Sequence, residues 1–141
     1  MKKTVYKSFS AEETKAIAEK IAKELNAGDV LCMYGDLGAG KTAFVQGLAK
    51  GLLIEAYVNS PTFTIVNEYM GTLPLYHFDV YRIGSSDEMF DIGFDEYIDG
   101  DGVSVIEWAE LIEDILPENR YNITINKTDE EDVREITVEV V

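Results

Sequence analysis

Gly35-Asp-Leu-Gly-Ala-Gly-Lys-Thr42 is the most informative string in this chain. It matches G-x-x-x-x-G-K-[ST] at every fixed position, which is the pattern of a loop that cradles nucleotide phosphates. The run from Val30 to Tyr34 before it is apolar throughout, as expected of a strand covered on both faces. Phe44, Val45 and Leu48 after it keep helical spacing. A buried strand, a glycine-rich loop and a helix in this order predict a P-loop.

The residues of this loop suit a triphosphate bound with Mg²⁺. Glycines let the backbone wrap the phosphates, and the amides of residues 38–43 point inward as donors. We expect Lys41 to bridge the β and γ phosphates and the Thr42 hydroxyl to occupy one Mg²⁺ position. The predicted nucleotide contacts are Gly35, Asp36, Leu37, Gly38, Ala39, Gly40, Lys41, Thr42 and Ala43.

Two acidic residues are candidates for supporting the metal ion and the attacking water. Glu107 ends the apolar run that begins at Val103, where P-loop proteins usually carry a carboxylate, although an aspartate is more usual there. Asp79 lies on a predicted strand whose alternation places it on one face with His77 and Tyr81. The competing interpretations are an exposed strand end for Glu107 and an ordinary surface acid for Asp79.

Other candidates carry weaker signals. Thr62 and Thr64 are both candidate nucleotide sensors, because they follow the P-loop helix, where such residues often occur. The alternative is that Pro61 only sets a turn there. Trp108 is compatible with stacking on a base, with a partner contact or with the core. Arg82 suits either a phosphate or one of the many carboxylates. The single histidine, His77, is predicted to be structural, because phosphoryl transfer does not require it.

The rest of the chain predicts further strands and helices around this centre. We expect a three-layer α/β sandwich of the P-loop NTPase type, with a central, mostly parallel sheet and antiparallel hairpin additions. Two stretches match a helix-capping box, one at Ser10 and one at Ser85. The predicted strands are 4–9, 30–34, 64–69, 75–81, 103–108, 121–126 and 133–141, and the predicted helices start near 10, 41, 85 and 110.

Length and charge narrow the function classes. The 141 residues suit a single P-loop ATPase domain over 1–141. Twelve basic against 27 acidic side chains leave a net charge of −15, so we expect no direct contact with nucleic acid. No apolar run approaches the roughly 20 residues that span a bilayer, and no signal peptide is apparent. The expected location is the cytoplasm.

Three other functions fit parts of the sequence. A GTPase has a literal match, since Asn126 to Asp129 spells N-K-x-D and Asp99 to Gly102 spells D-x-x-G. The first falls in an acidic turn without a following helix, and the second precedes its strand. A small-molecule kinase would need more arginines than the three present. A nucleotide-dependent switch without useful turnover stays open as the non-enzyme alternative.

Four blocks together resemble one family. GDLGAGKT at Gly35, SPTF at Ser60, HFDVYR at His77 and EWAE at Glu107 occur in this order. In this order and spacing they are similar to the bacterial tRNA threonylcarbamoyladenosine biosynthesis ATPases, the TsaE family, also known as YjeE. The segments before Thr14 and after Pro117 carry little of the resemblance.

The resemblance implies an ATPase that works with TsaD and TsaB, the subunits that attach threonylcarbamoyl to adenosine of tRNA. Such proteins do not perform that transfer, and their hydrolysis is thought to reset the complex. By position, Lys41 and Thr42 would bind phosphates and Mg²⁺, Asp79 and Glu107 would support metal and water, and Thr62 would sense the nucleotide. We expect weak hydrolysis by the chain alone, stimulation by the partners, and only indirect contact with tRNA.

Overall fold

The computed structural model describes residues 2–35, 40–59, 61 and 65–141. Its described strands form one sheet in the order β1-β7-β6-β2-β5-β4-β3. The strands are β1 (Lys2–Ser8), β2 (Val30–Gly35), β3 (Val66–Tyr69), β4 (Leu75–Asp79), β5 (Val103–Glu107), β6 (Tyr121–Lys127) and β7 (Arg134–Val140). The helices are α1 (Ala11–Ala22), α2 (Lys41–Gly51), α3 (Asp87–Asp91), α4 (Phe94–Ile98) and the 3₁₀ helix η1 (Ala109–Ile115).

Parallel pairing holds the centre of the sheet and antiparallel pairing extends both sides. β2 pairs in parallel with β5 and β6, and β4 pairs in parallel with β5. The hairpin β3–β4 adds one edge, and the hairpin β6–β7 followed by β1 adds the other. The predicted fold class, an α/β fold with a parallel centre to the sheet and antiparallel hairpin additions, is confirmed, and three of the six strand pairings are parallel.

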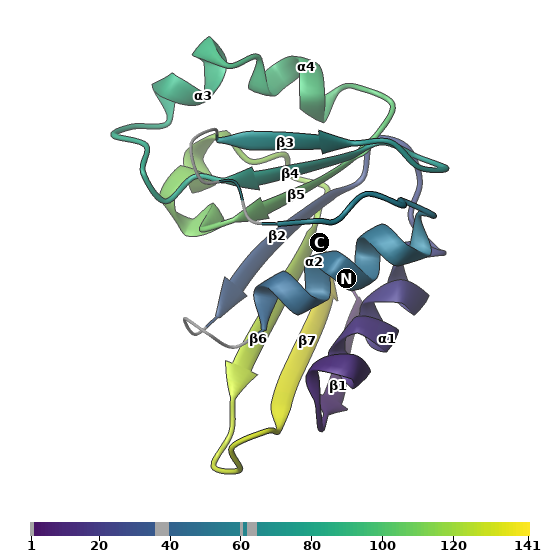
Figure 1. The fold of residues 1–141 in the computed structure, drawn as a ribbon. Coiled ribbons are helices and arrows are strands. Elements are labelled where there is room, and N and C mark those ends of the chain that lie inside the picture. The colour runs from purple at the N-terminus through teal and green to yellow at the C-terminus, as the bar shows by residue number, and fades with distance from the viewer. Residues whose placement is uncertain (1, 36–39, 60, 62–64) are drawn as a thin grey trace.

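Alternation along β2 shows how the sheet separates two apolar cores. Leu31 and Met33 join the core beneath α1 and α2, whereas Val30 and Cys32 join the core beneath α3, α4 and η1. Successive side chains of a strand point to opposite faces, so a strand buried on both faces reads as a continuous apolar run. The helices therefore form two outer layers around the sheet, as Figure 1 shows.

Close backbone contact joins the two helices on the first face. A Cβ on Gly47 of α2 would lie 2.3 Å from the carbonyl oxygen of Lys15, and a Cβ on Gly51 would lie 2.6 Å from that of Glu19. The two glycines are four positions apart in the helix, so both face α1. The absence of side chains at these positions lets α2 pack directly on the backbone of α1.

Several element boundaries differ from the sequence expectations. α1 ends at Ala22, although apolar residues keep helical spacing as far as Leu25, and β4 ends at Asp79 rather than Tyr81. The β4 strand stops because the Asp79 carboxylate accepts a hydrogen bond from the Tyr81 amide at 3.0 Å and turns the chain. Gly93 has φ +82° and begins α4, a helix that is not among the predicted ones.

The capping-box predictions are half right. Ser10 accepts a hydrogen bond from the Glu13 amide at 3.1 Å, but the Glu13 carboxylate reaches the Phe9 amide rather than that of Ser10. At the second box, Ser86 is the N-terminal cap residue, and its side chain makes no capping hydrogen bond. The Glu88 carboxylate there accepts from the Ser85 amide at 3.0 Å.

Candidate active site

Strand register brings the candidate site residues to one edge of the sheet. Met33 of β2 lies opposite Glu107 of β5, and Glu107 lies opposite Asp79 of β4. Because these three strands are parallel, their carboxyl ends meet, and Gly35 closes β2 two residues beyond Met33. Ligands of open α/β sheets bind at this edge. Residues that are far apart in sequence thus share one location.

Gly35 and Gly40 bracket the loop in backbone conformations that side chains rarely adopt. Their φ angles are +126° and +105°. A Cβ on Gly35 would lie 2.0 Å from the carbonyl oxygen of Ile125, so only glycine fits there. Predicted contacts Asp36, Leu37, Gly38 and Ala39, and the candidate sensors Thr62 and Thr64, lie outside the described residues.

Lys41 begins α2 and is 8% exposed. Its ammonium group lies 4.9 Å from the centre of the Trp108 ring, a cation–π geometry. In the first turn of the helix, Thr42 is exposed and Ala43 is half-buried. Free amides at a helix N-terminus attract anions, so the start of α2 combines a fixed cation with a favourable dipole.

Trp108 occupies the left-handed region, with φ 64° and ψ 34°. This conformation costs about 1–2 kcal/mol for a residue with a side chain. The Trp108 ring also lies 4.8 Å, centre to centre, from the ring of Tyr81. A strained residue directly after Glu107 is typical of functional sites. The structure thus places Trp108 beside Lys41 rather than in the interior of the core.

Asp79 and Glu107 differ in environment although they are register partners. Asp79 is half-buried, and burial raises the pKa of its carboxyl above the ordinary 3.8. The hydrogen bond from the Tyr81 amide opposes that rise, and the negative charge of Glu107 adds to it. Glu107 is 6% exposed, so the alternative of an exposed strand end is wrong for its surroundings.

His77 contacts Glu107, which the sequence does not predict. Its Nε2 atom lies 2.5 Å from Oε2 of Glu107, and the histidine is fully buried. The alternation that grouped His77 with Asp79 was visible in the sequence. The contact of His77 with Glu107 on β5 was not visible, because it depends on the β4–β5 register.

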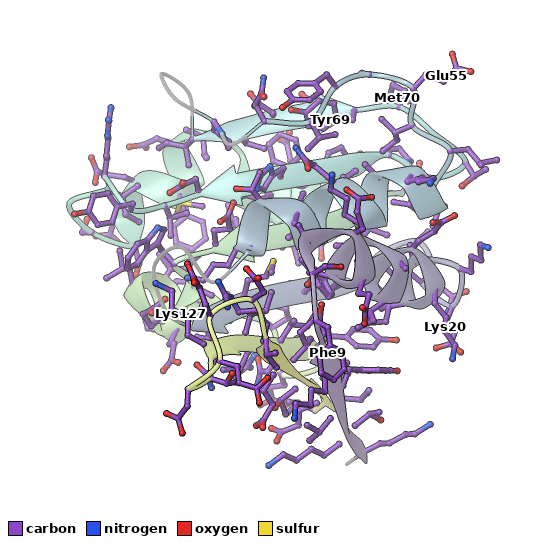
Figure 2. All side chains as sticks on the ribbon, turned by 60° about the horizontal axis from the view of Figure 1, so that its bottom comes forward. Phe9, Lys20, Glu55, Tyr69, Met70 and Lys127 are labelled. Atoms are coloured by element: carbon purple, nitrogen blue, oxygen red, sulfur yellow. The ribbon has the colours of Figure 1, made fainter. Side chains whose placement is uncertain are left out.

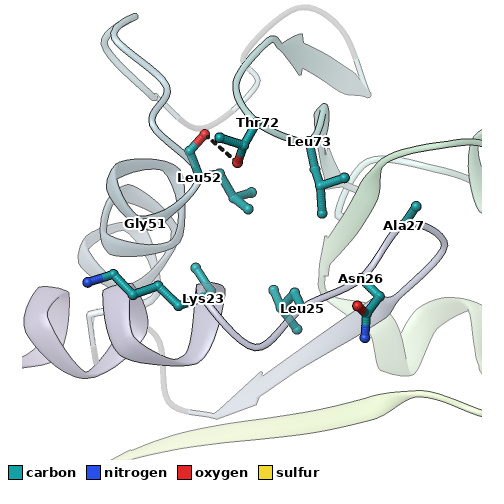
Figure 3. Close-up of a pocket in the computed structure, with 9 residues that line it drawn as sticks. Lys23, Leu25, Asn26, Ala27, Gly51, Leu52, Thr72 and Leu73 are labelled. Carbon is teal, nitrogen blue, oxygen red and sulfur yellow. Dashed lines mark hydrogen bonds between the residues drawn. The ribbon is translucent and has the colours of Figure 1, made fainter.

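A separate hollow of about 460 Å³ lies at the opposite end of α2 (Figure 3). Its lining includes Leu25, Leu52, Thr72 and Leu73, with Lys23 at the C-terminal end of α1. Helix C-termini present carbonyl oxygens and partial negative charge, which disfavours phosphate. The phosphate site is therefore better placed at the Gly35–Lys41 end.

The GTPase-like strings lie in unsuitable places. Asn126 and Lys127 end β6, and the following turn leads directly to the antiparallel β7 (Figure 2 labels Lys127 on this hairpin). Residues 99–102 form the turn before β5. Neither string therefore has the surroundings that guanine or γ-phosphate recognition would need.

Comparison with known proteins agrees with this arrangement. The family model described as "Threonylcarbamoyl adenosine biosynthesis protein TsaE" matches residues 8–136. The chain belongs to the TsaE family.

Individual relatives of this family align over most of the chain. The tRNA threonylcarbamoyladenosine biosynthesis protein TsaE of Bacillus subtilis (strain 168) is 54% identical over 97% of this chain and 85% of its own length. The protein of the same name from Treponema pallidum (strain Nichols) is 46% identical, over 93% of this chain and 96% of its own length. The crystal structure of Bacillus subtilis YdiB superimposes with a TM-score of 0.83 at 46% identity, over 99% of this chain and 86% of that one.

No helix in the described ranges is long and apolar enough to cross a membrane. Within the same ranges, no three His, Cys, Asp or Glu side chains gather as a ready-made metal site. The oxygen groups at this edge of the sheet and at the start of α2 include the Thr42 hydroxyl and the carboxylates of Asp79 and Glu107. Hydroxyl and carboxylate oxygens are ligands that Mg²⁺ prefers, and Mg²⁺ usually takes only one or two carboxylates along with phosphate oxygens. This donor set fits Mg²⁺ held jointly by protein and nucleotide.

Proposed function

We propose that this chain is a Mg²⁺-dependent P-loop ATPase that serves the threonylcarbamoyladenosine modification of tRNA. The observation that carries the proposal is the meeting of Gly35, Lys41, Asp79 and Glu107 at the carboxyl edge of three parallel strands. The family membership supports the biological role. The cytoplasmic location expected from the sequence belongs to the same proposal.

In this proposal the loop and α2 bind the phosphates. The Lys41 ammonium leaves the Trp108 ring to contact the β and γ phosphates, and the helix dipole adds partial positive charge. Local positive charge is essential, because the net charge of −15 repels polyphosphate elsewhere on the molecule. Residues 36–39 would contribute backbone donors, as the P-loop string predicts.

Mg²⁺ bound at Thr42 with Asp79 and Glu107 would neutralise charge on the phosphate oxygens. The two carboxylates would divide the remaining work, which is to support the ion and to orient the attacking water. Asp79 is held by the Tyr81 amide and Glu107 by His77, so both carboxylates have restrained positions. Preorganised charge of this kind accounts for most of the rate enhancement in phosphoryl transfer.

Calorimetry with Mg·ATP tests binding. Wild type should bind, and Lys41→Ala should weaken binding by about 1.5–3 kcal/mol, the usual contribution of a hydrogen bond to a charged group. Lys50→Ala is the matched control, because Lys50 lies in the last turn of the same helix and is exposed. Equal affinities for wild type and Lys41→Ala would refute the phosphate site.

Turnover is tested separately from binding. Glu107→Gln should keep ATP affinity and retain only a small residual rate of hydrolysis, and unchanged turnover in that variant would remove Glu107 from the mechanism. We also propose that TsaD and TsaB are the partners and that they stimulate a weak basal rate. Equal rates with and without these proteins would contradict that part of the proposal and leave the ATPase assignment standing.

A further inference from the structure

The buried contact between His77 and Glu107 requires a functional explanation. His77 is 0% exposed and the Glu107 side chain is 8% exposed, with 2.5 Å between Nε2 and Oε2. Burying a carboxylate is costly unless it is hydrogen-bonded. A tyrosine, leucine or phenylalanine at position 77 would fill the core without this contact. The histidine therefore supplies something beyond volume.

The second ring nitrogen indicates which tautomer is present. Nδ1 of His77 is buried and has no hydrogen-bond partner among the residues that the structure describes. If the proton lies on Nε2, the ring donates to Glu107 and Nδ1 is left as an unpaired acceptor. Proteins tolerate an unpaired acceptor more readily than a buried, unpaired N–H. The contact is thus best described as Nε2–H donating to Oε2.

Strand register explains how the ring orients the carboxylate. His77 lies opposite Val105, two residues before the Asp79–Glu107 pair, so the hydrogen bond joins two diagonal neighbours on adjacent strands. A carboxylate is planar and rigid. With Oε2 held by the imidazole, the direction of Oε1 is therefore set as well.

We propose that His77 is a positioning residue that orients the Glu107 carboxylate for ATP hydrolysis, an inference that rests on the proposed function. Partners that orient functional groups in this way typically contribute 10- to 100-fold in activity when removed. His77 would act through Glu107 and not on the nucleotide, so its loss should lower kcat and leave ATP binding in place.

Two amide variants separate this role from packing. His77→Gln places its amide nitrogen near the position of Nε2 and retains the donor to Glu107. His77→Asn is one carbon shorter, and its amide stops near Nδ1. We expect His77→Asn to lower kcat roughly 10- to 100-fold with the calorimetric Kd for Mg·ATP unchanged, and His77→Gln to recover most of the loss. Thermal unfolding of both variants reports any general loss of packing.

The Glu107→Gln background supplies a second test. If His77 acts through the Glu107 carboxylate, adding His77→Asn to Glu107→Gln should cause no further loss of turnover. A further loss of turnover in the double variant would overturn the positioning role, and so would equal losses of kcat in His77→Asn and His77→Gln. In either case, hydrolysis by the wild type would leave the ATPase proposal intact. Wild type without any turnover would instead overturn the ATPase proposal itself.

A measurement without nucleotide covers the case in which position 77 tolerates no change. His77 is the only histidine, so its ring signals in long-range ¹H–¹⁵N NMR spectra need no assignment. We expect a protonated Nε2 and an unprotonated Nδ1, with a Nε2 resonance that moves in Glu107→Ala. The control Glu118→Ala changes an exposed acid two residues before Arg120 and should leave the resonance in place. A resonance that ignores Glu107→Ala would overturn the contact and the role built on it.

Discussion

Lys41 and Trp108 face each other across the start of α2 and the end of β5, with 4.9 Å between the ammonium nitrogen and the ring centre. Lys41 is 8% exposed, and in a desolvated site such a contact contributes about 2 kcal/mol. Phosphate oxygens offer the ammonium group several charge-assisted hydrogen bonds, which together are stronger. Lys41 is the side chain proposed to contact the phosphates, and the Trp108 indole lies beside it. The indole should therefore sense any movement of Lys41.

Trp108 fluorescence should thus follow nucleotide binding. Trp108 is the only tryptophan, so the emission has a single source. Because phosphate draws Lys41 away from the ring, Mg·ATP should shift the emission spectrum with the half-saturation found by calorimetry. Lys41→Ala should start from a shifted spectrum and show at least tenfold weaker response to ATP. The same response in both proteins would contradict the Lys41–Trp108 account.

Asp79 should cost stability at neutral pH. Burial raises the pKa of its carboxyl in the folded chain above the ordinary 3.8, so between these two pKa values the folded chain holds more protons than the unfolded one. The contribution of Asp79 to stability therefore falls as pH rises through that window. Asp79→Asn should raise the urea midpoint at about pH 7.5, and the gain should shrink towards about pH 4.

Loss of one negative charge could itself stabilise a chain of net charge −15. Asp101→Asn removes one charge from the exposed turn before β5 and controls for that general effect. A gain for Asp79→Asn no greater than that of Asp101→Asn would show that burial of Asp79 is not the cause.

The P-loop string and its flanking elements made the centre of this fold predictable. The apolar run at Val30 and the helical spacing after Lys41 depend on local pattern alone, and both elements occur where they were expected. α4 is absent from the predicted helices because Gly93 interrupts the helical pattern before it. A glycine with positive φ can both end one helix and begin another. Phe94, Tyr97 and Ile98 did carry helical spacing, so the signal was present.

The sequence does not predict which residues of neighbouring strands contact each other across the sheet. The sequence indicates Asp79 and Glu107 as candidate site residues from two separate strand patterns. Only the β4–β5 register shows that they are neighbours. The same register brings His77 within hydrogen-bond distance of Glu107, whereas the sequence predicts only a structural role for this histidine. Register depends on the whole sheet rather than on either strand, which is why composition and spacing did not reveal these pairs.

Cys32 should be unreactive in the native protein. It lies in the central strand β2 with 0% exposure, and burial raises the pKa of its thiol to about 12. The thiolate is the reactive form, so a thiol reagent at about pH 8 should label the native chain far more slowly than the urea-unfolded chain. Rapid native labelling would mean that β2 is accessible, in conflict with its central position in the sheet.

Gly47→Ala should destabilise the protein although alanine is the better helix former. Propensity alone would favour alanine by about 1 kcal/mol. The added Cβ would lie 2.3 Å from the Lys15 carbonyl oxygen and 2.7 Å from the Ala18 Cβ, so α1 and α2 would have to separate. Overpacking of this kind typically costs about 1–3 kcal/mol. Urea unfolding of Gly47→Ala beside Lys50→Ala, an exposed change on the same helix, measures the difference. A Gly47→Ala protein as stable as the Lys50→Ala control would mean that the two helices are not held at backbone contact.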